Sequence, residues 1–115
     1  PETIFTQTYP NGLVLVAEQM PWLRSAAFTL LLPAGCAREP VDRGGLAAFT
    51  AEMAERGCGS RDSRQFLLDL DNLGLEWHEF VSPAHTGYCG AAPAESLPKA
   101  LAIFADVARR PHFPR

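Results

Sequence analysis

The chain has 115 residues, of which 47% are hydrophobic, and a formal net charge of -3. This length allows one small core, and the composition is that of an ordinary globular domain. The slightly acidic balance excludes a basic field for nucleic acid. The longest apolar run, residues 26–34, is far shorter than the roughly 20 residues that a membrane-spanning helix needs.

The first part of the chain predicts three strands. Residues 3–8 and 13–19 are extended runs separated by Asn11-Gly12, a dipeptide that favours a hairpin turn. Residues 26–32 form a nearly continuous apolar run, which predicts a strand buried on both faces. A loop rich in glycine and proline follows.

Hydrophobic periodicity predicts three helices in the remainder. The first, residues 46–56, has the apolar stripe Leu46, Phe49, Thr50 and Met53. The second, residues 63–73, has the stripe Phe66, Leu67, Leu70 and Leu73. The third, residues 97–109, follows Ser96 as N-cap and has the stripe Leu97, Ala100, Leu101, Phe104 and Ala108.

A second hairpin is expected between the second and third helices. Its strands are residues 75–82 and 86–92, and its turn is at Pro83-Ala84. The complete order is β-β-β-α-α-β-β-α. This order predicts an α+β fold in which an antiparallel sheet has helices packed on one face. Cys36, Cys58 and Cys89 have no CxxC spacing and are an odd number, so we expect buried free thiols rather than a disulfide scaffold.

Several short motifs, in this order and spacing, resemble the pitrilysin/insulinase family of metallopeptidases. The resemblance covers nearly the whole chain. It is carried by Asn11-Gly12-Leu13, Ala34-Gly35, Glu39-Pro40, Gly45-Leu46-Ala47, Phe49, Met53, Gly57, Leu73-Gly74, Leu97-Pro98-Lys99-Ala100-Leu101, Asp106, Pro111 and Phe113. It implies that residues 1–115 are the N-terminal portion of one such peptidase domain. Because the chain ends at Arg115 without a capping element, we expect it to be a piece of a longer protein.

The signature motif of this family is His-x-x-Glu-His on a helix. Residues at i, i+3 and i+4 share one helical face, so two imidazoles can hold Zn²⁺ while the glutamate acts on bound water. The corresponding positions here are Ala48, Ala51 and Glu52, so we expect no catalytic residue and no metal in this chain. Glu52 is expected to pair with Arg56 at i, i+4. The family's more distant glutamate would lie beyond Arg115.

Two other groups of residues are candidate sites. His78, Glu79, His85 and Cys89 fall within one predicted hairpin, but neighbouring strand residues diverge, so ordinary strand and turn roles are expected. In the family, the strand at residues 75–82 pairs with extended peptide substrate. The resemblance therefore makes His78, Glu79, Phe80 and Val81 candidate substrate-binding residues, against plain sheet packing with Trp77 or Phe80 in the core.

These observations favour a non-catalytic, peptidase-like subunit or domain. It would pair with a zinc-bearing homologue and help to enclose a peptide, so zinc is expected only in the active partner. The alternative is a structural core subunit that touches no substrate, and a peptidase with a relocated metal site is a third possibility. A half-domain should also associate with itself through uncovered apolar surface. The sequence gives no compartment beyond an expected bacterial cytoplasm or periplasm.

Overall fold

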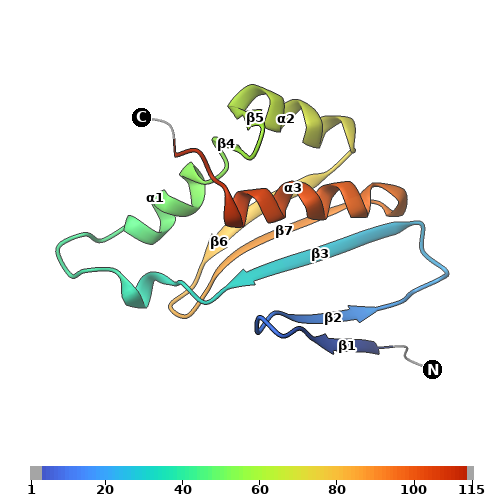
Figure 1. The fold of residues 1–115 in the computed structure, drawn as a ribbon, viewed down its shortest axis with the longest axis horizontal. Helices are drawn as coiled ribbons and strands as arrows, with labels where there is room; N and C mark the ends of the chain where they lie inside the picture. The colour runs from blue at the N-terminus through green and yellow to red at the C-terminus, as the bar shows by residue number, and fades with distance from the viewer. Residues whose placement is uncertain (1–3, 114–115) are drawn as a thin grey trace.

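The computed structural model describes residues 4–113, except the side chain of Arg38. Figure 1 shows the elements in chain order. They are β1 (Ile4–Thr8), β2 (Val14–Glu18), β3 (Ser25–Leu32), α1 (Leu46–Met53), β4 (Gly57–Cys58), β5 (Arg61–Asp62), α2 (Ser63–Asn72), β6 (Glu76–Val81), β7 (Thr86–Pro93) and α3 (Leu97–Arg109). Short 3₁₀ turns lie at Cys36–Arg38 and Ala94–Ser96. Apart from the β4–β5 ribbon, which was not predicted, the observed order of elements is the order predicted from the sequence. Thr3, the first residue of the first predicted strand, lies outside the described residues.

The principal sheet has three antiparallel strands in the order β3-β7-β6. Strand β7 is central, with Ser25↔Pro93 and Leu32↔Thr86 as the end pairs to β3 and Glu76↔Ala91 as the first pair to β6. The three helices lie on one side of this sheet, and the β1–β2 hairpin lies apart from them (Figure 1). The predicted α+β architecture, with helices on one face of an antiparallel sheet, is therefore confirmed.

The prediction that the apolar run of β3 is buried on both faces is wrong. Exposure alternates along the strand, with half-buried residues at Ala26, Phe28, Leu30 and Leu32 and exposed residues between them. The reason is that helices cover only one face of the sheet within residues 4–113. The second face of β3 carries Leu31, which is 53% exposed.

The predicted apolar stripe of α1 is also wrong. Leu46 and Phe49 are 41% and 64% exposed, whereas Ala51 and Ala54 are buried at 2% and 5%. Small side chains let the helix lie close to β6, and this close packing outweighs the hydrophobicity of the larger residues. The helix also ends earlier than predicted, at Met53.

The other two helices follow their predicted stripes in part. Phe66 and Leu70 of α2 and Ala100 and Phe104 of α3 are buried, but Leu67 and Leu101 are 48% and 44% exposed. The helix N-cap with a side-chain hydrogen bond is Asp62, which accepts from the backbone N–H of Gln65 at 2.8 Å. The predicted N-cap Ser96 makes no such hydrogen bond.

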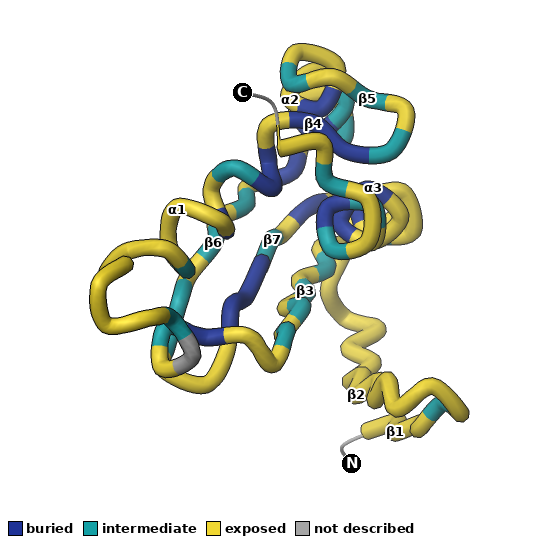
Figure 2. The backbone as a smooth tube through the Cα atoms, turned by 60° about the vertical axis from the view of Figure 1, so that its left-hand side comes forward, coloured by how far each residue is buried: buried dark blue, intermediate teal, exposed yellow. Residues whose placement is uncertain are grey.

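An aromatic cluster centred on Phe104 joins the helices to the sheet. The ring centroid of Phe104 lies 5.4 Å from Phe28, 6.2 Å from Phe66, 6.0 Å from Trp77 and 6.0 Å from Tyr88. These rings come from α3, β3, α2, β6 and β7. In Figure 2, buried segments lie on β7 and α3, whereas β3 and β6 alternate between intermediate and exposed residues. Trp77 therefore packs against the core, as one of the two predicted alternatives, while Phe80 is 36% exposed.

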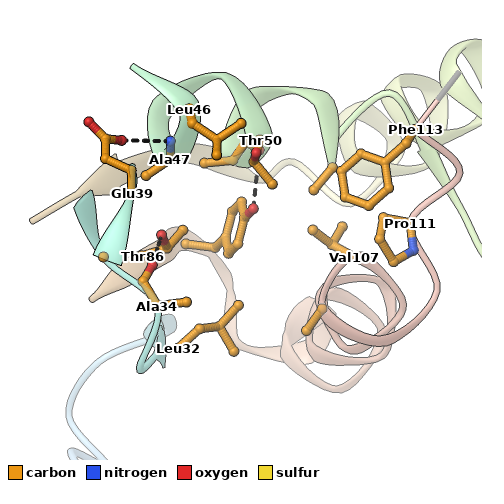
Figure 3. A pocket seen from close by; sticks show the side chains of 15 residues that line it. Leu32, Ala34, Glu39, Leu46, Ala47, Thr50, Thr86, Val107, Pro111 and Phe113 are labelled. Atoms are coloured by element: carbon orange, nitrogen blue, oxygen red, sulfur yellow. Dashed lines mark hydrogen bonds between the residues drawn. The ribbon is translucent and has the colours of Figure 1, made fainter. Parts of the chain in front are cut away.

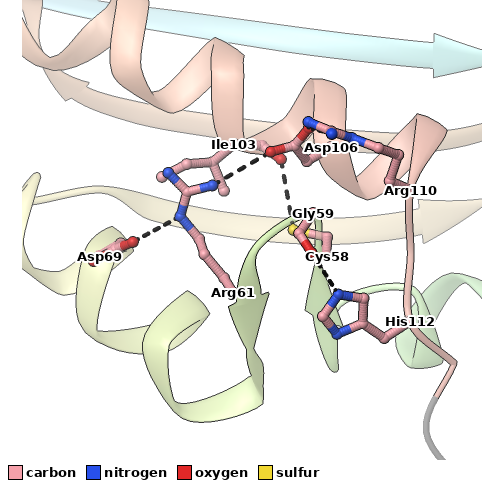
Figure 4. Close-up of polar contacts among 8 residues, drawn as sticks. All are labelled: Cys58, Gly59, Arg61, Asp69, Ile103, Asp106, Arg110 and His112. Atoms are coloured by element: carbon pink, nitrogen blue, oxygen red, sulfur yellow. Dashed lines mark hydrogen bonds and ion pairs between the residues drawn. The ribbon is translucent and has the colours of Figure 1, made fainter.

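Charged side chains tie α2 to α3 at the edge of this core (Figure 4). Arg61 of β5 lies 2.6 Å from Asp69 of α2 and 3.3 Å from Asp106 of α3. The hydrogen bond from Arg61 lowers the pKa of the Asp69 carboxyl. Backbone bonds from Gly59 to Arg110 and from His112 to Gly57 attach β4 to the segment after α3. The exposed His112 also lies 2.7 Å from the carbonyl of Gly59.

The β1–β2 hairpin carries apolar side chains that nothing else covers within the described residues. Both strands are exposed along their full length. The exposed large side chains are Ile4, Phe5, Leu13, Val14, Leu15 and Val16. No described helix is long and apolar enough to cross a membrane.

Replacing Phe104 tests whether the aromatic cluster holds the fold. Phe104→Ala is expected to lower the free energy of unfolding by about 3–5 kcal/mol, because it leaves a cavity among four rings. Leu101→Ala, on the exposed side of the same helix, should cost about 0.5 kcal/mol. Urea unfolding followed by tryptophan fluorescence measures both. Equal losses in the two variants would contradict the central role of Phe104.

Candidate functional site

The N-terminus of α1 is held by Glu39, which lies six to eight residues earlier in the chain. Its two carboxylate oxygens accept hydrogen bonds from the backbone N–H groups of Gly45, at 3.1 Å, and Ala47, at 3.0 Å. Gly45 has φ 90°, a left-handed conformation that glycine adopts without strain. Glu39 thus satisfies two free N–H groups and places a negative charge at the positive end of the helix.

The three positions at which the resemblance places the zinc motif do not form one accessible surface. Ala48 and Glu52 are exposed, whereas Ala51 is 2% exposed. The carbonyl of Ala51 accepts a hydrogen bond from the Tyr88 hydroxyl at 3.1 Å, which fixes that side of α1 against β7. Position 51 is therefore turned toward the sheet and away from solvent.

These residues do not fit a zinc ion. Alanine has no donor atom, and the remaining candidate, Glu52, forms an ion pair with Arg56 at 3.0 Å. This pair confirms the i, i+4 interaction expected from the sequence. Among residues 4–113, no group of three or more His, Cys, Asp or Glu side chains is arranged to hold a metal. No hydrolytic step through zinc follows from this helix.

The candidate substrate-binding residues lie on β6, at an edge of the three-stranded sheet. His78 and Phe80 are exposed, and Glu79 and Val81 are half-buried. The alternation confirms that His78 and Glu79 point to opposite faces. Glu79 and Val81 face the helices, whereas His78 and Phe80 face away from them. In the described part of the sheet, β6 pairs only with β7, so its other backbone edge is open.

Under α1, two carboxyl groups meet in the interior. Glu55 follows the helix and is 7% exposed, and its side chain hydrogen bonds with that of Glu79. Burial raises the pKa of Glu55 to about 9, and the neighbouring Glu79 and Glu52 add to the increase. Its Oε2 atom is buried without a partner among the described atoms. A protonated Glu55 is therefore the form that this site accommodates near neutral pH.

Tyr88 lies beside this pair, opposite Glu79 in the β6–β7 register. Burial raises the pKa of the Tyr88 phenol to about 12, with smaller contributions from Glu55 and Glu79. The phenol accordingly stays protonated, and its O–H group donates a hydrogen bond to the Ala51 carbonyl. The arrangement provides structural support for α1 and contains no group poised as a general base.

Next to Tyr88, an apolar cavity of about 320 Å³ opens between α1, the sheet and the end of α3. Figure 3 shows Leu46, Ala47 and Thr50 facing Val107, Pro111 and Phe113 across it. Thr86 closes one wall, where its hydroxyl donates to the Ala34 carbonyl. The cavity contains few polar groups, so it can receive an apolar group but supplies no chemistry.

Of the two histidines in the β6–β7 hairpin, only His78 lies next to Cys89. The Nε2 atom of His78 lies 2.8 Å from the Sγ atom of Cys89, its direct partner across the β6–β7 pair. His85 lies apart in the turn, where its backbone bonds to Ser82. The cysteines differ from the expected buried thiols, because Cys58 is buried but Cys36 and Cys89 are half-buried. All three are free thiols.

Comparison with known proteins identifies the family. The model of the insulinase family, peptidase family M16, matches residues 14–115. The chain belongs to this family. The insulinase-family chain is 30% identical over 102 residues to the beta subunit of the mitochondrial-processing peptidase of Saccharomyces cerevisiae, covering 89% of this chain and 22% of the relative. It is also 30% identical over 103 residues to an uncharacterised zinc protease of Rickettsia bellii, covering 90% and 25%.

The fold of this family member matches that of pitrilysin. The crystal structure of pitrilysin superposes with a TM-score of 0.86 and 21% identity, covering 96% of this chain and 12% of pitrilysin. The chain spans between a fifth and a quarter of the length of the two sequence relatives. The predicted family and fold are thus confirmed.

Three structural features around α1 and the β6–β7 hairpin were not predicted from the sequence. Glu39 was recognised as part of a motif but not as the cap of α1, although an acidic residue shortly before Gly44-Gly45 is a usable signal. Glu55 gave no signal, because a glutamate in a helical pattern is normally exposed. The contact between His78 and Cys89 depends on strand register, which no local pattern in the hairpin specifies.

Removing the ionisable group at Glu55 should change how stability depends on pH. The folded pKa of about 9 lies above the unfolded value of 4.5, so the folded state binds the proton more tightly. The stabilisation is complete below pH 4.5 and is lost as pH rises toward 9. We expect the wild type to lose at least about 1 kcal/mol between pH 5 and pH 8, whereas Glu55→Gln stays flat.

Urea unfolding at a series of pH values measures this difference. Glu52→Gln is the matched control, because Glu52 is exposed and its pair with Arg56 is at the surface. Parallel pH curves for the wild type and Glu55→Gln would show that the Glu55 carboxyl is not held protonated.

Proposed function

We propose that this chain is a non-catalytic part of an insulinase-family assembly, which pairs with a zinc-bearing homologue and helps to bind peptide for proteolysis. The observation that carries the proposal is the state of α1. Two of the three motif positions are alanine, and Glu52 is engaged by Arg56. The helix keeps its cap and its packing but offers no set of zinc ligands and no base.

A role in peptide binding is supported by the edge of β6. An extended peptide can add to an open strand through main-chain hydrogen bonds, with side chains alternating between the two faces. Residues 78–81 supply such an edge, and the alternation of His78 and Phe80 with Glu79 and Val81 gives the two faces different chemistry. Enclosure by this strand would align a peptide without contributing a chemical group.

A pairing role is supported by the relatives and by the exposed surface. The yeast relative is by name one subunit of a peptidase. The β1–β2 hairpin exposes apolar side chains that are suited to contact with another polypeptide. A structural subunit without peptide contact would use the same hairpin, so peptide binding at β6 is what distinguishes the two functions.

Zinc content tests the loss of the metal site. The wild-type chain, freed of any tag, is expected to contain no stoichiometric zinc by elemental analysis. The variant Ala48→His/Ala51→Glu/Glu52→His restores two imidazoles at i and i+4 and should bind about one zinc per chain. A matched variant, Ala48→His/Ala51→Glu/Met53→His, places the imidazoles on different faces and should bind none.

Two results would count against this proposal, one against the absence of a metal site and one against the assigned face of α1. Stoichiometric zinc in the wild type would show a metal site outside this helix. A folded triple variant that binds no better than the matched variant would show that the exposed face of α1 does not present positions 48 and 52 together.

The exposed hairpin predicts that the isolated chain associates with itself. Light scattering over a concentration series should show a mass that rises with concentration, because association removes the apolar side chains of β1 and β2 from water. Val16→Lys, at a position 66% exposed, should shift the equilibrium toward monomer. Val41→Lys, at a fully exposed loop position, is the matched control. A wild type that stays monomeric at high concentration would contradict the prediction.

A further inference from the structure

The sheet face that points away from the helices contains a thiol and an imidazole in direct contact. Cys89 of β7 and His78 of β6 are cross-strand partners, and Sγ lies 2.8 Å from Nε2 and 3.5 Å from Nδ1. His78 is exposed and Cys89 is half-buried, so both are within reach of small solutes. Neither residue takes part in the proposed loss of zinc chemistry on α1.

The pairing is fixed by the sheet rather than by flexible side chains. Cys89 is bracketed by Thr29 of β3 on one side and His78 on the other, in a single row across three strands. The next row on the same face places the Phe80 ring over Gly87, where an added Cβ would lie only 2.1 Å from the ring. The register therefore holds His78 opposite the sulfur, and Phe80 lies over the neighbouring Gly87.

The protonation state of the pair decides how the sulfur reacts. Burial raises the pKa of the Cys89 thiol, so the sulfur carries its proton at neutral pH. In the tautomer with its proton on Nδ1, the His78 imidazole accepts that S–H at Nε2. A thiol hydrogen bonded to an imidazole is the arrangement in which a base can remove the proton as the sulfur attacks.

We propose that Cys89 is a peroxide-reactive thiol that His78 activates, and that this sheet face is a site of reversible oxidation to sulfenic acid. The sulfur attacks one oxygen of hydrogen peroxide and the O–O bond breaks. The thiol proton passes to Nε2 of His78 and then to the departing hydroxide, which leaves as water. The balance is Cys–SH + H₂O₂ → Cys–SOH + H₂O, in which sulfur is oxidised and peroxide is reduced.

The other two cysteines are internal comparisons within the same chain. Cys58 is 0% exposed, and its Sγ lies 3.9 Å from the Ile103 carbonyl, so it should react slowest. Cys36 is half-buried like Cys89, but no histidine nitrogen lies within hydrogen-bond distance of its sulfur among the described side chains. Cleavage at Arg38, Arg56, Arg61 and Arg64 puts the three cysteines on different tryptic peptides.

The experiment measures sulfenic acid formation at each cysteine of the full chain. The reduced protein is exposed to hydrogen peroxide in the presence of dimedone, and the labelled tryptic peptides are quantified by mass spectrometry over time. Cys89 is expected to react on the order of tenfold faster than Cys36, below the 10²–10⁴ that a tuned catalytic base supplies. Cys89→Ser identifies the signal.

Two histidine variants separate base catalysis from exposure. His78→Gln keeps a hydrogen-bonding side chain but cannot take the proton, so it should reduce the Cys89 rate to that of Cys36. His85→Gln changes the other histidine of the same hairpin, which makes no hydrogen bond to the Cys89 sulfur, and should leave the rate unchanged. Circular dichroism of both variants confirms that they are folded.

The proposal is overturned by any of three results. They are a Cys36 rate equal to or above that of Cys89 in the wild type, a folded His78→Gln chain that keeps the wild-type Cys89 rate, and an equal loss in His85→Gln. The first comparison needs no substitution, so it decides the matter even if His78→Gln does not fold.

Discussion

The ring of Phe104 is the interaction on which the rest of the structure depends. It lies against rings from β3, α2, β6 and β7, so one side chain of α3 holds two helices and all three strands of the principal sheet in one arrangement. Tilted and edge-on aromatic pairs add to the free energy gained by burying their area. The small domain gains much of its limited core from these few rings, because a chain of this length buries a modest fraction of its surface.

Helix α1 is attached to that core by different means. It contributes alanines rather than large side chains, and its position is fixed by the Glu39 carboxylate at one end and by the Tyr88 hydroxyl on the Ala51 carbonyl. Both contacts are made to backbone groups. The orientation of α1 therefore does not require a particular side chain at position 48 or 52, and the helix keeps its place with alanine at position 48.

The sequence predicted the α+β order, the hairpin at Asn11-Gly12 and the bounds of α3, because periodicity and turn residues report local structure directly. It failed where packing between elements decides the outcome. Periodicity predicts the stripe of α1 at Leu46, Phe49, Thr50 and Met53. The side chains that close approach to the sheet buries are instead Ala51 and Ala54. The proposed loss of the zinc motif rests on the sequence alone, because it depends only on residue identity and spacing. The burial of Glu55 and the contact of His78 with Cys89 depend on helix placement and strand register, which one sequence does not specify.

The two faces of the β6–β7 pair then have opposite chemical characters. Toward the helices, Glu79 meets Glu55 beside Tyr88, and burial favours the protonated forms of Glu55 and Tyr88 beneath α1. Away from the helices, His78 meets Cys89 where solvent has access. Because successive residues of a strand point to opposite faces, a single strand supports both environments without conflict. Polar groups that strengthen the packing of α1 are thereby kept apart from polar groups that are free to react, and a change on the open face need not disturb the core that Phe104 organises.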